Sequence, residues 1–263
     1  MTSYAAAAGT RIGYDTHGTG PDVIFLHAGI ADRSMWQPQV DAFGDRFRCT
    51  TPDNRGFGDT PVGDEPFSRR DDLASVLDAV GAPTATVVGC SIGAGFALDF
   101  AIERPERVDK LILVGVTPAG FDHEDDALLV ETWRDVDAAI ERGDFEEAGR
   151  LEARAWIDGP RRPAGSAASW LRDRVVEWSI PINQVEDWGD SLQLDPPAMQ
   201  RMGAVTMPTL VMVGTEDADV IIAGCRATAQ GIPGAEYVEI GGAAHFPNLA
   251  SPDEFNAAVL SFL

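Results

Sequence analysis

The chain has 263 residues, of which 44% are hydrophobic and 24% are charged, and this composition supplies a sizeable core for one domain. Its 42 acidic residues against 20 basic ones give a net charge of −22 at pH 7. A surface of that sign repels nucleic acid and anionic lipid headgroups, so both are excluded as expected partners.

The cysteines and the opening segment indicate in which cellular compartment the protein is expected. Three cysteines stand far apart in the sequence, which does not make a disulfide framework and favours a reducing environment. The opening segment MTSYAAAAGTRIGYD lacks the basic stretch and the apolar stretch of a secretory signal. No apolar run approaches the roughly 20 residues that span a bilayer. We therefore expect a cytoplasmic protein that does not enter a membrane.

Strands alternate with helices along most of the chain. Short runs rich in valine, isoleucine and leucine predict strands, and apolar residues at helical spacing predict helices. In chain order the strands lie within 22–29, 84–89, 108–115, 209–214 and 235–240, and the helices at 69–80, 92–104, 221–230 and 252–263. Nearly continuous apolar strands between helices indicate an α/β fold, with a mostly parallel sheet and helices on both faces.

The alternation breaks between residues 118 and 205, where the pattern is helical and polar. Five of the six tryptophans lie in this stretch: Trp133, Trp156, Trp170, Trp178 and Trp188. A helical insertion rich in aromatic residues predicts a cap over a pocket at the carboxyl ends of the strands. The core domain is then 1–117 together with 206–263. Alternatively, each of these tryptophans packs only into the small core of the insertion.

Residues 89–93, Gly-Cys-Ser-Ile-Gly, match the pattern G-x-S-x-G between a predicted strand and a predicted helix. Glycines at both ends allow a strained turn that presents the central side chain above the sheet, and a helical N–H can then face an oxyanion. Ser91 is central and is the candidate nucleophile. Cys90 is expected to point toward the sheet and to pack as a small apolar residue.

A serine hydroxyl needs a base to take its proton and a third group to orient that base. The four histidines are His17, His27, His123 and His245. His245 follows the last predicted strand in a glycine-rich loop, from which a base can reach Ser91. Asp217, directly after the strand at 209–214, is the preferred acid. Asp219 is the alternative, because a turn there can present either carboxylate.

These motifs together resemble those of the capped α/β-hydrolases, and the similarity covers nearly the whole chain. The matching segments are LHAG with the following MW, DNRGFGDT, GCSIGAG, ERPERVDKLILVG, PTLVMVGTED and GAAHFPNLASPDEF. Carried over position by position, the resemblance implies Ser91 as nucleophile, Asp217 as acid and His245 as base. It also implies an oxyanion hole built from the backbone N–H groups of Gly29 and Ile92.

The chain departs from the family pattern at two positions. Ala28 stands where the family often has glycine, and alanine tolerates a positive φ less well. Thr60 stands where the segment DNRGFGDT usually ends in serine, so the hydroxyl is kept. Asp53 and Arg55 in the same segment are expected to be structural.

The resemblance implies a serine hydrolase that cleaves a small, neutral, mostly apolar ester or lactone through an acyl-enzyme on Ser91. Residues expected to contact the substrate are His27, Trp156, Trp178 and Phe246, although His27 is alternatively a residue that orders its loop. We expect no metal and no cofactor, because the sequence has neither a metal-ligand cluster nor a phosphate-binding glycine loop. Alternatives on the same triad are carbon–carbon bond hydrolysis, perhydrolysis or a lyase step. A ligand sensor that retains the triad is a further alternative.

Overall fold

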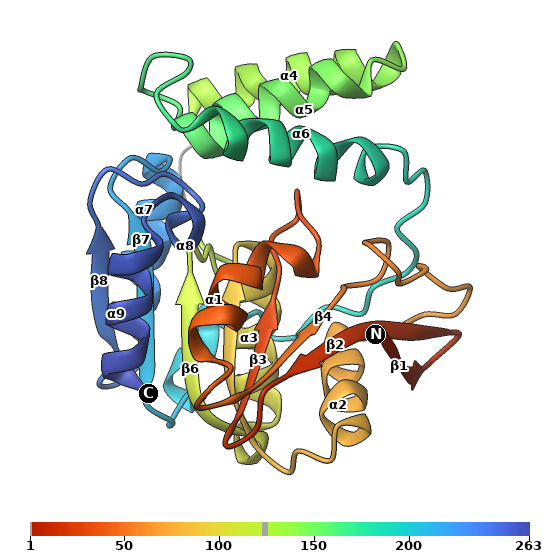
Figure 1. The fold of residues 1–263 in the computed structure, drawn as a ribbon, viewed down its shortest axis with the longest axis vertical. Helices are drawn as coiled ribbons and strands as arrows, with labels where there is room; N and C mark the ends of the chain where they lie inside the picture. Colours follow the sequence, from red (N-terminus) through yellow and green to blue (C-terminus); the bar gives the residue numbers. More distant parts are fainter. Residues whose placement is uncertain (1, 123–125) are drawn as a thin grey trace.

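The computed structural model describes residues 2–122 and 126–263, and this part of the chain forms one eight-stranded sheet, shown in Figure 1. The strands are β1 (Ser3–Ala7), β2 (Thr10–His17), β3 (Asp22–Leu26), β4 (Arg48–Pro52), β5 (Ala85–Cys90), β6 (Val108–Val114), β7 (Thr209–Gly214) and β8 (Glu236–Ile240). Their order is β1-β2-β4-β3-β5-β6-β7-β8, with β1 and β2 antiparallel to their neighbours and the other pairs parallel. The predicted α/β fold is confirmed. His123 lies outside the described residues.

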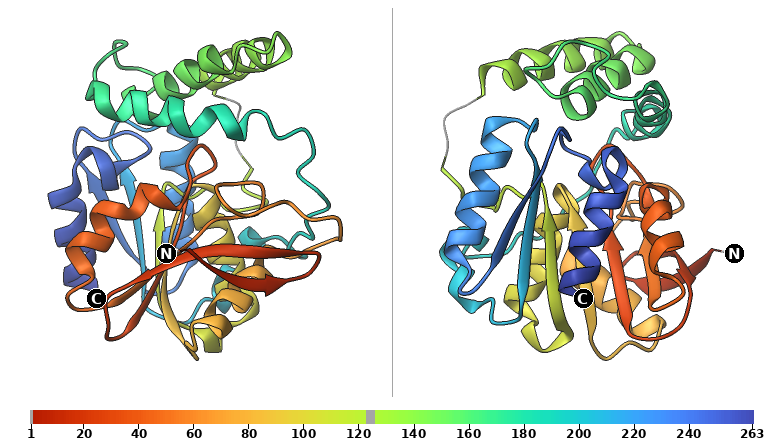
Figure 2. Two further views of the ribbon diagram at one scale, coloured as in Figure 1. Left: turned by 45° about the vertical axis from the view of Figure 1, so that its right-hand side comes forward. Right: turned by 60° about the vertical axis from the view of Figure 1, so that its left-hand side comes forward.

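Helices cover both faces of the sheet, as the two views of Figure 2 show. They are α1 (Gln37–Phe43), α2 (Arg69–Ala79), α3 (Ile92–Glu103), α7 (Asp219–Gly231), α8 (Pro247–Ala250) and α9 (Pro252–Phe262). α2, α3 and α7 pack on one face and α1 and α9 on the other. The strand residues alternate between these faces: Val87 joins the first core and Val88 the second. Because both faces are covered, all six residues of β5 are buried.

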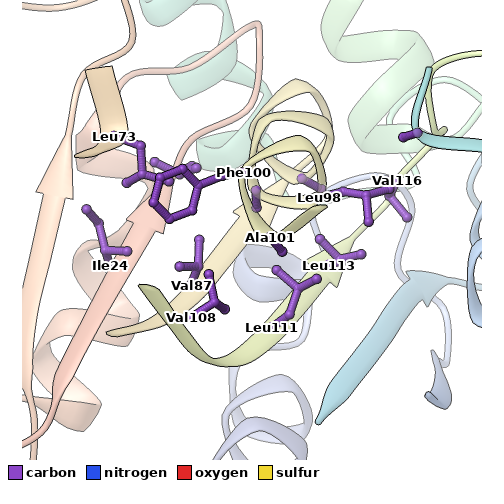
Figure 3. Packing of buried hydrophobic residues seen from close by; sticks show 14 of the residues in the cluster. Ile24, Leu73, Val87, Leu98, Phe100, Ala101, Val108, Leu111, Leu113 and Val116 are labelled. Carbon is purple, nitrogen blue, oxygen red and sulfur yellow. The ribbon is translucent and has the colours of Figure 1, made fainter. Parts of the chain in front are cut away.

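The core between α2, α3 and the sheet is close-packed, as Figure 3 shows. Phe100 of α3 lies over Val87, Leu98 of the same helix lies beside Leu113, and Leu73 reaches in from α2. All five side chains are at most 4% exposed. This packing fixes α3 on the sheet, and with it the turn at Ser91 that begins the helix.

A helical layer lies above the carboxyl ends of the strands (Figures 1 and 2). It contains α4 (Ala127–Glu141), α5 (Phe145–Ala153), a π-helical turn η3 (Arg154–Asp158) and α6 (Ser169–Ile182), and two 3₁₀ turns at Ala198–Gln200 and Met202–Ala204 lead back to β7. Its own small core holds Val136, Ala139 and Ala148, with Trp133 packed against them. Trp133 therefore packs against the insertion's own core, which is what the alternative interpretation expects of it. No helix in the described residues is long and apolar enough to cross a membrane.

The segment after β4 is held by buried charges. Arg55 is fully buried and donates two hydrogen bonds to Asp72, at 2.7 and 2.6 Å. Asp53 is also fully buried and accepts hydrogen bonds from the backbone N–H groups of Arg33 and Asp59, at 2.9 and 2.8 Å. Both residues are therefore structural, as predicted. The hydroxyl of Thr60 accepts the N–H of Gly13 at 2.8 Å and joins this segment to β2.

Asp99 on α3 gives the stability of the fold a pH dependence. Burial raises the pKa of this carboxyl from 3.8 to about 6. Because the folded state binds the proton more tightly than the unfolded state, this residue favours folding most below pH 3.8, and its contribution falls as the pH rises toward 6. Asp99→Asn should remove that loss and raise the free energy of unfolding at pH 7 by on the order of 1 kcal/mol.

Urea denaturation of both proteins at pH 4 and pH 7 measures this effect. The advantage of the variant should be clear at pH 7 and should shrink at pH 4, where Asp99 is protonated. Asp45→Asn, at an exposed position, serves as the matched control and should show no such trend. An advantage of equal size at both pH values contradicts the titration of Asp99.

Candidate active site

Ser91 stands at a strained turn between β5 and α3. Its φ of 56° and ψ of −121° make it the one residue other than glycine with a positive φ in the part of the chain that the structure describes. A side chain in this conformation carries a steric cost, which the packed strand and helix on either side offset. The turn holds Ser91 partly exposed at the carboxyl end of β5, while Cys90 before it is buried.

The two glycines of the motif let the turn pack this closely. A Cβ on Gly89 would stand 2.3 Å from the carbonyl oxygen of Gly93. A Cβ on Gly93 would stand 2.5 Å from the carbonyl oxygen of Leu26 and 2.6 Å from that of His27. Glycine is needed at both positions because the backbones of α3, β5 and the loop after β3 touch directly.

Cys90 packs into the core, as predicted. Its side chain is fully buried in the cluster beneath α1 and α9, and its sulfur lies 3.8 Å from the carbonyl oxygen of His245. Burial raises the pKa of this thiol well above its usual value, and the nearby charge of Asp217 adds to the shift. A thiol that stays protonated and buried is a poor nucleophile.

The structure brings Asp217 and His245 together. Asp217 follows β7 and His245 follows β8, and Asp217 Oδ2 lies 2.7 Å from His245 Nδ1. The other carboxylate oxygen of Asp217 accepts the N–H of Ala218 at 2.8 Å, which fixes the carboxylate plane. Both side chains are at most 2% exposed. Since Nδ1 faces the carboxylate, the remaining ring nitrogen, Nε2, is the one left to act as a base.

The loop after β6 makes room for this pair. Gly115 has a φ of 60°, and a Cβ there would lie 3.0 Å from His245 Cε1 and 3.1 Å from His245 Nδ1. A side chain at this position would therefore press on the imidazole. Nothing in the local sequence distinguishes Gly115 from other glycines that end strands, so its role could not be predicted.

Asp219, the alternative acid, points elsewhere. Its carboxylate is 76% exposed and forms an ion pair with Arg161 at 2.6 Å. Asp219 also opens α7, where a carboxylate near the helix N-terminus is favourable. The geometry therefore favours Asp217 over Asp219 as the partner of His245.

Gly29, in the loop after β3, and Ile92, the first residue of α3 after β5, lie next to each other because β3 and β5 are parallel neighbours. A Cβ on Gly29 would stand 3.2 Å from Ile92 Cδ1, so the loop after β3 touches the first residue of α3. Ile92 carries the first N–H of that helix, which has no partner within the helix. Ala28 is not in the left-handed region that favours glycine, so its methyl group causes no strain, and its N–H faces the sulfur of Met35 at 3.2 Å.

His27 orders the loop after β3. It is fully buried, and its Nε2 accepts the N–H of Asn54 at 2.9 Å. Nδ1 therefore carries the proton and donates to the carbonyl oxygen of Ala28 at 2.8 Å. Burial lowers the pKa of this imidazole, which keeps it neutral. With both ring nitrogens engaged, the prediction that His27 contacts substrate is not supported, and the alternative of a loop-ordering role describes it.

Two of the three aromatic residues predicted to contact the substrate lie beside His245, and the third contacts Ser34. Trp156 of η3 lies against His245, with ring centroids 4.4 Å apart, and the ring of Phe246 lies 5.9 Å from the same imidazole. Trp178 of α6 is 6% exposed, and its indole N–H donates to Ser34 Oγ at 3.1 Å. Trp178 thus links α6 to the loop before α1, and its recorded polar contact is with protein, not with the Asp217–His245 pair.

A polar cavity lies elsewhere in the structure, away from Asp217 and His245. A cavity of about 500 Å³ beside β2 and α1 is lined by Arg33, Asp32 and neighbouring polar residues, and neither Asp217 nor His245 lines it. Among the described residues, no group of three His, Cys, Asp or Glu side chains is arranged to hold a metal ion.

Comparison with known proteins identifies the family. The family model for the alpha/beta hydrolase fold matches residues 21–252. A pimeloyl-[acyl-carrier protein] methyl ester esterase of Nitrosospira multiformis is 26% identical, over 93% of this chain and 95% of its own. A putative carbamate hydrolase, RutD, of Azorhizobium caulinodans is 28% identical, over 98% and 97%. The solved enol-lactonase of Burkholderia xenovorans has the same fold, with a TM-score of 0.77 at 24% identity over 99% of each chain.

The chain belongs to the α/β-hydrolase family and is an enzyme of the hydrolase type. Its fold, with the sheet order and the turn at Ser91 described above, is the one that the resemblance of its motifs implied.

Asp217→Asn should lower kcat by roughly 10³–10⁴-fold while the protein stays folded, because an amide in place of the carboxylate holds the imidazole in the wrong tautomer. Steady-state kinetics on a chromogenic ester, with circular dichroism as the folding check, measures this. Asp219→Asn is the matched control and should keep most of the activity. A larger loss in Asp219→Asn than in Asp217→Asn would reverse the choice of acid.

Proposed function

We propose that this hydrolase cleaves small, mostly apolar carboxylic esters or lactones through an acyl-enzyme on Ser91. The observation that carries the proposal is the buried Asp217–His245 hydrogen bond at the same edge of the sheet as the strained turn of Ser91. The names of relatives give further support: one is a methyl ester esterase and one a putative carbamate hydrolase, and both activities transfer an acyl group to water.

In the proposed reaction, His245 acts first as a base and then as an acid in each of two acyl transfers. His245 Nε2 takes the proton of the Ser91 hydroxyl as its oxygen attacks the substrate carbonyl carbon. The N–H groups of Gly29 and Ile92 stabilise the oxyanion of the tetrahedral intermediate. His245 then gives its proton to the leaving alkoxide, and the acyl-enzyme remains. His245 then takes a proton from water as the water oxygen attacks the acyl carbon, and it gives that proton to the Ser91 oxygen as the bond between that oxygen and the acyl carbon breaks. The carboxylic acid leaves, and the Ser91 hydroxyl and the neutral imidazole are restored.

Two further features belong to the same proposal. We assign residues 118–205 as a cap that covers the site, with 1–117 and 206–263 as the catalytic core. We also propose a cytoplasmic location, supported by three cysteines that are all unpaired and buried.

Ser91→Ala should lower kcat by several orders of magnitude and abolish labelling by a fluorophosphonate, a probe that forms a covalent bond with an activated serine. Cys90→Ala should fold and retain most of both signals, because Cys90 only packs in the core. Mass spectrometry of the labelled peptide locates the probe. Labelling that persists in Ser91→Ala and disappears in Cys90→Ala would assign the nucleophile to Cys90.

The net charge of the protein limits the charge of the substrates that it is expected to accept. A net charge of −22 produces a negative field, and such fields are focused in clefts. Four arginines of the cap each already bond another group of the protein: Arg161, Arg162, Arg172 and Arg174. We therefore expect a substrate with several negative charges to meet repulsion that these four arginines offset only weakly.

A neutral short-chain ester should be a much better substrate than a coenzyme A thioester with the same acyl group. Its kcat/KM should change little between low and physiological salt, since screening acts mainly on charged reactants. Measuring both substrates at both salt concentrations tests this. If the thioester is the better substrate at low salt, a basic site for it exists and the charge argument is wrong.

A further inference from the structure

One end of the helical layer is attached directly to the loops that carry the acid and the base. The backbone N–H of His245 donates to the carbonyl oxygen of Trp156 at 3.0 Å. Arg162 donates to the carbonyl oxygen of Gly242 at 2.8 Å, in the same loop as His245. Gly159, which ends η3, lies so close to the acid loop that a Cβ there would stand 2.5 Å from the carbonyl oxygen of Glu216.

The end of η3 explains why this attachment falls at Trp156. The last carbonyl groups of a helix have no partner within it and need one from outside. Because η3 ends at Asp158, the carbonyl of Trp156 is one of these groups, and the N–H of His245 satisfies it. π-Helical turns are uncommon and often occur at functional sites. Here the turn lies against the acid–base pair of the proposed site.

The side chain of Trp156 covers one face of the imidazole. The two ring centroids are 4.4 Å apart and the rings are tilted by 32°, so the indole lies in close contact with the imidazole ring. Asp217 holds the Nδ1 edge of the same ring, and Gly115 lies beside its Cε1 atom. A stacked indole hinders the imidazole from turning about its side-chain bond, so the contacts together leave Nε2 in one orientation.

Stacking also changes in strength during the proposed reaction. The imidazole becomes a cation when it takes the serine proton, and the face of an indole attracts a cation more strongly than it attracts a neutral ring. The contact is therefore stronger in the transition state than in the resting enzyme. An interaction of that kind raises kcat and leaves substrate binding unchanged.

We propose that Trp156 is a positioning residue for His245, which orients the imidazole by stacking and stabilises its protonated form during acyl transfer. This assigns Trp156 a different role from a wall of the substrate pocket. The inference rests on the proposed function, because it requires His245 to act as the base for Ser91.

The test compares Trp156→Leu with Trp156→Phe. Leucine keeps an apolar cover over His245 and removes the aromatic face, whereas phenylalanine keeps a face. The backbone hydrogen bond from His245 remains possible in both. With a short-chain p-nitrophenyl ester, Trp156→Leu should lose about tenfold in kcat with KM unchanged, and Trp156→Phe should recover most of the loss. The acidic limb of the kcat/KM profile should move to lower pH by about half a unit in Trp156→Leu.

Two controls separate the possible outcomes. Trp170→Leu removes a tryptophan that is 56% exposed on α6 and should leave the kinetics and the pH profile unchanged. The rate of fluorophosphonate labelling of Ser91 reports on the serine–base pair without a substrate, and it should fall in Trp156→Leu in parallel with kcat. Thermal melting shows whether each variant is folded. If Trp156→Leu does not fold, Trp156→Met, which also keeps an apolar side chain and removes the aromatic face, takes its place in the same measurements.

Several results would overturn the inference. A higher KM at unchanged kcat in Trp156→Leu makes Trp156 a substrate contact. Wild-type labelling rates and an unshifted pH profile in both variants make it packing only. Absence of labelling in the wild-type protein, by contrast, contradicts the proposed function itself.

Discussion

The hydrogen bond between Asp217 and His245 is the interaction around which the site is arranged. It joins residues 28 positions apart, and it forms because β7 and β8 are parallel neighbours whose carboxyl ends meet. Buried carboxylates are costly unless they are paired, and Asp217 is paired with an imidazole and with the N–H of Ala218. The loops after these two strands are therefore fixed by the same bond that orients the imidazole of His245.

Successive strands each contribute one element to this edge of the sheet. β5 presents Ser91, β6 is followed by Gly115, and β7 and β8 lead to Asp217 and His245. On the other side of β5, β3 leads to Gly29 beside Ile92. The site thus depends on strand order more than on any single loop. A glycine after β6 matters as much as the polar residues, since a side chain there would occupy the space of the imidazole.

Five of the six parallel strands and the turn at Ser91 could be predicted from the sequence because their signals are local, whereas the segment RCTTP of β4 has no continuous apolar run and was not among the predicted strands. Continuous apolar runs mark strands covered on both faces, and the glycines of GCSIG mark the tight turn. β1 was not predicted, since SYAAA has a mostly exposed, alanine-rich pattern that does not distinguish a strand. β2 was also missed, because this antiparallel strand lies near the sheet edge and is only partly buried.

The finer features of the site depend on contacts between distant segments, which no local pattern encodes. Asp217 and Asp219 are two residues apart, and only the position of His245 on one side and of Arg161 on the other separates their roles. His27 has the sequence context of a pocket residue, but Asn54 and Ala28 engage both of its ring nitrogens. Trp156 was expected at the pocket because it is aromatic. Its stacking on His245 follows from the π-helical turn and from Gly159, neither of which has a distinctive sequence.

The attachment of η3 to the base loop limits how the helical layer can move. A rigid opening of the whole layer would break the hydrogen bond from His245 to Trp156 and separate the two stacked rings. It would also expose the imidazole, which is 2% exposed in this structure, to water. A separate attachment, from α6 to Ser34, consists of hydrogen bonds that Trp178 and Arg174 donate to one hydroxyl, at 3.1 and 3.2 Å. For the proposed reaction, a path that admits substrate without disturbing His245 therefore has to open away from η3, so that the Asp217–His245 pair stays assembled while substrate enters and product leaves.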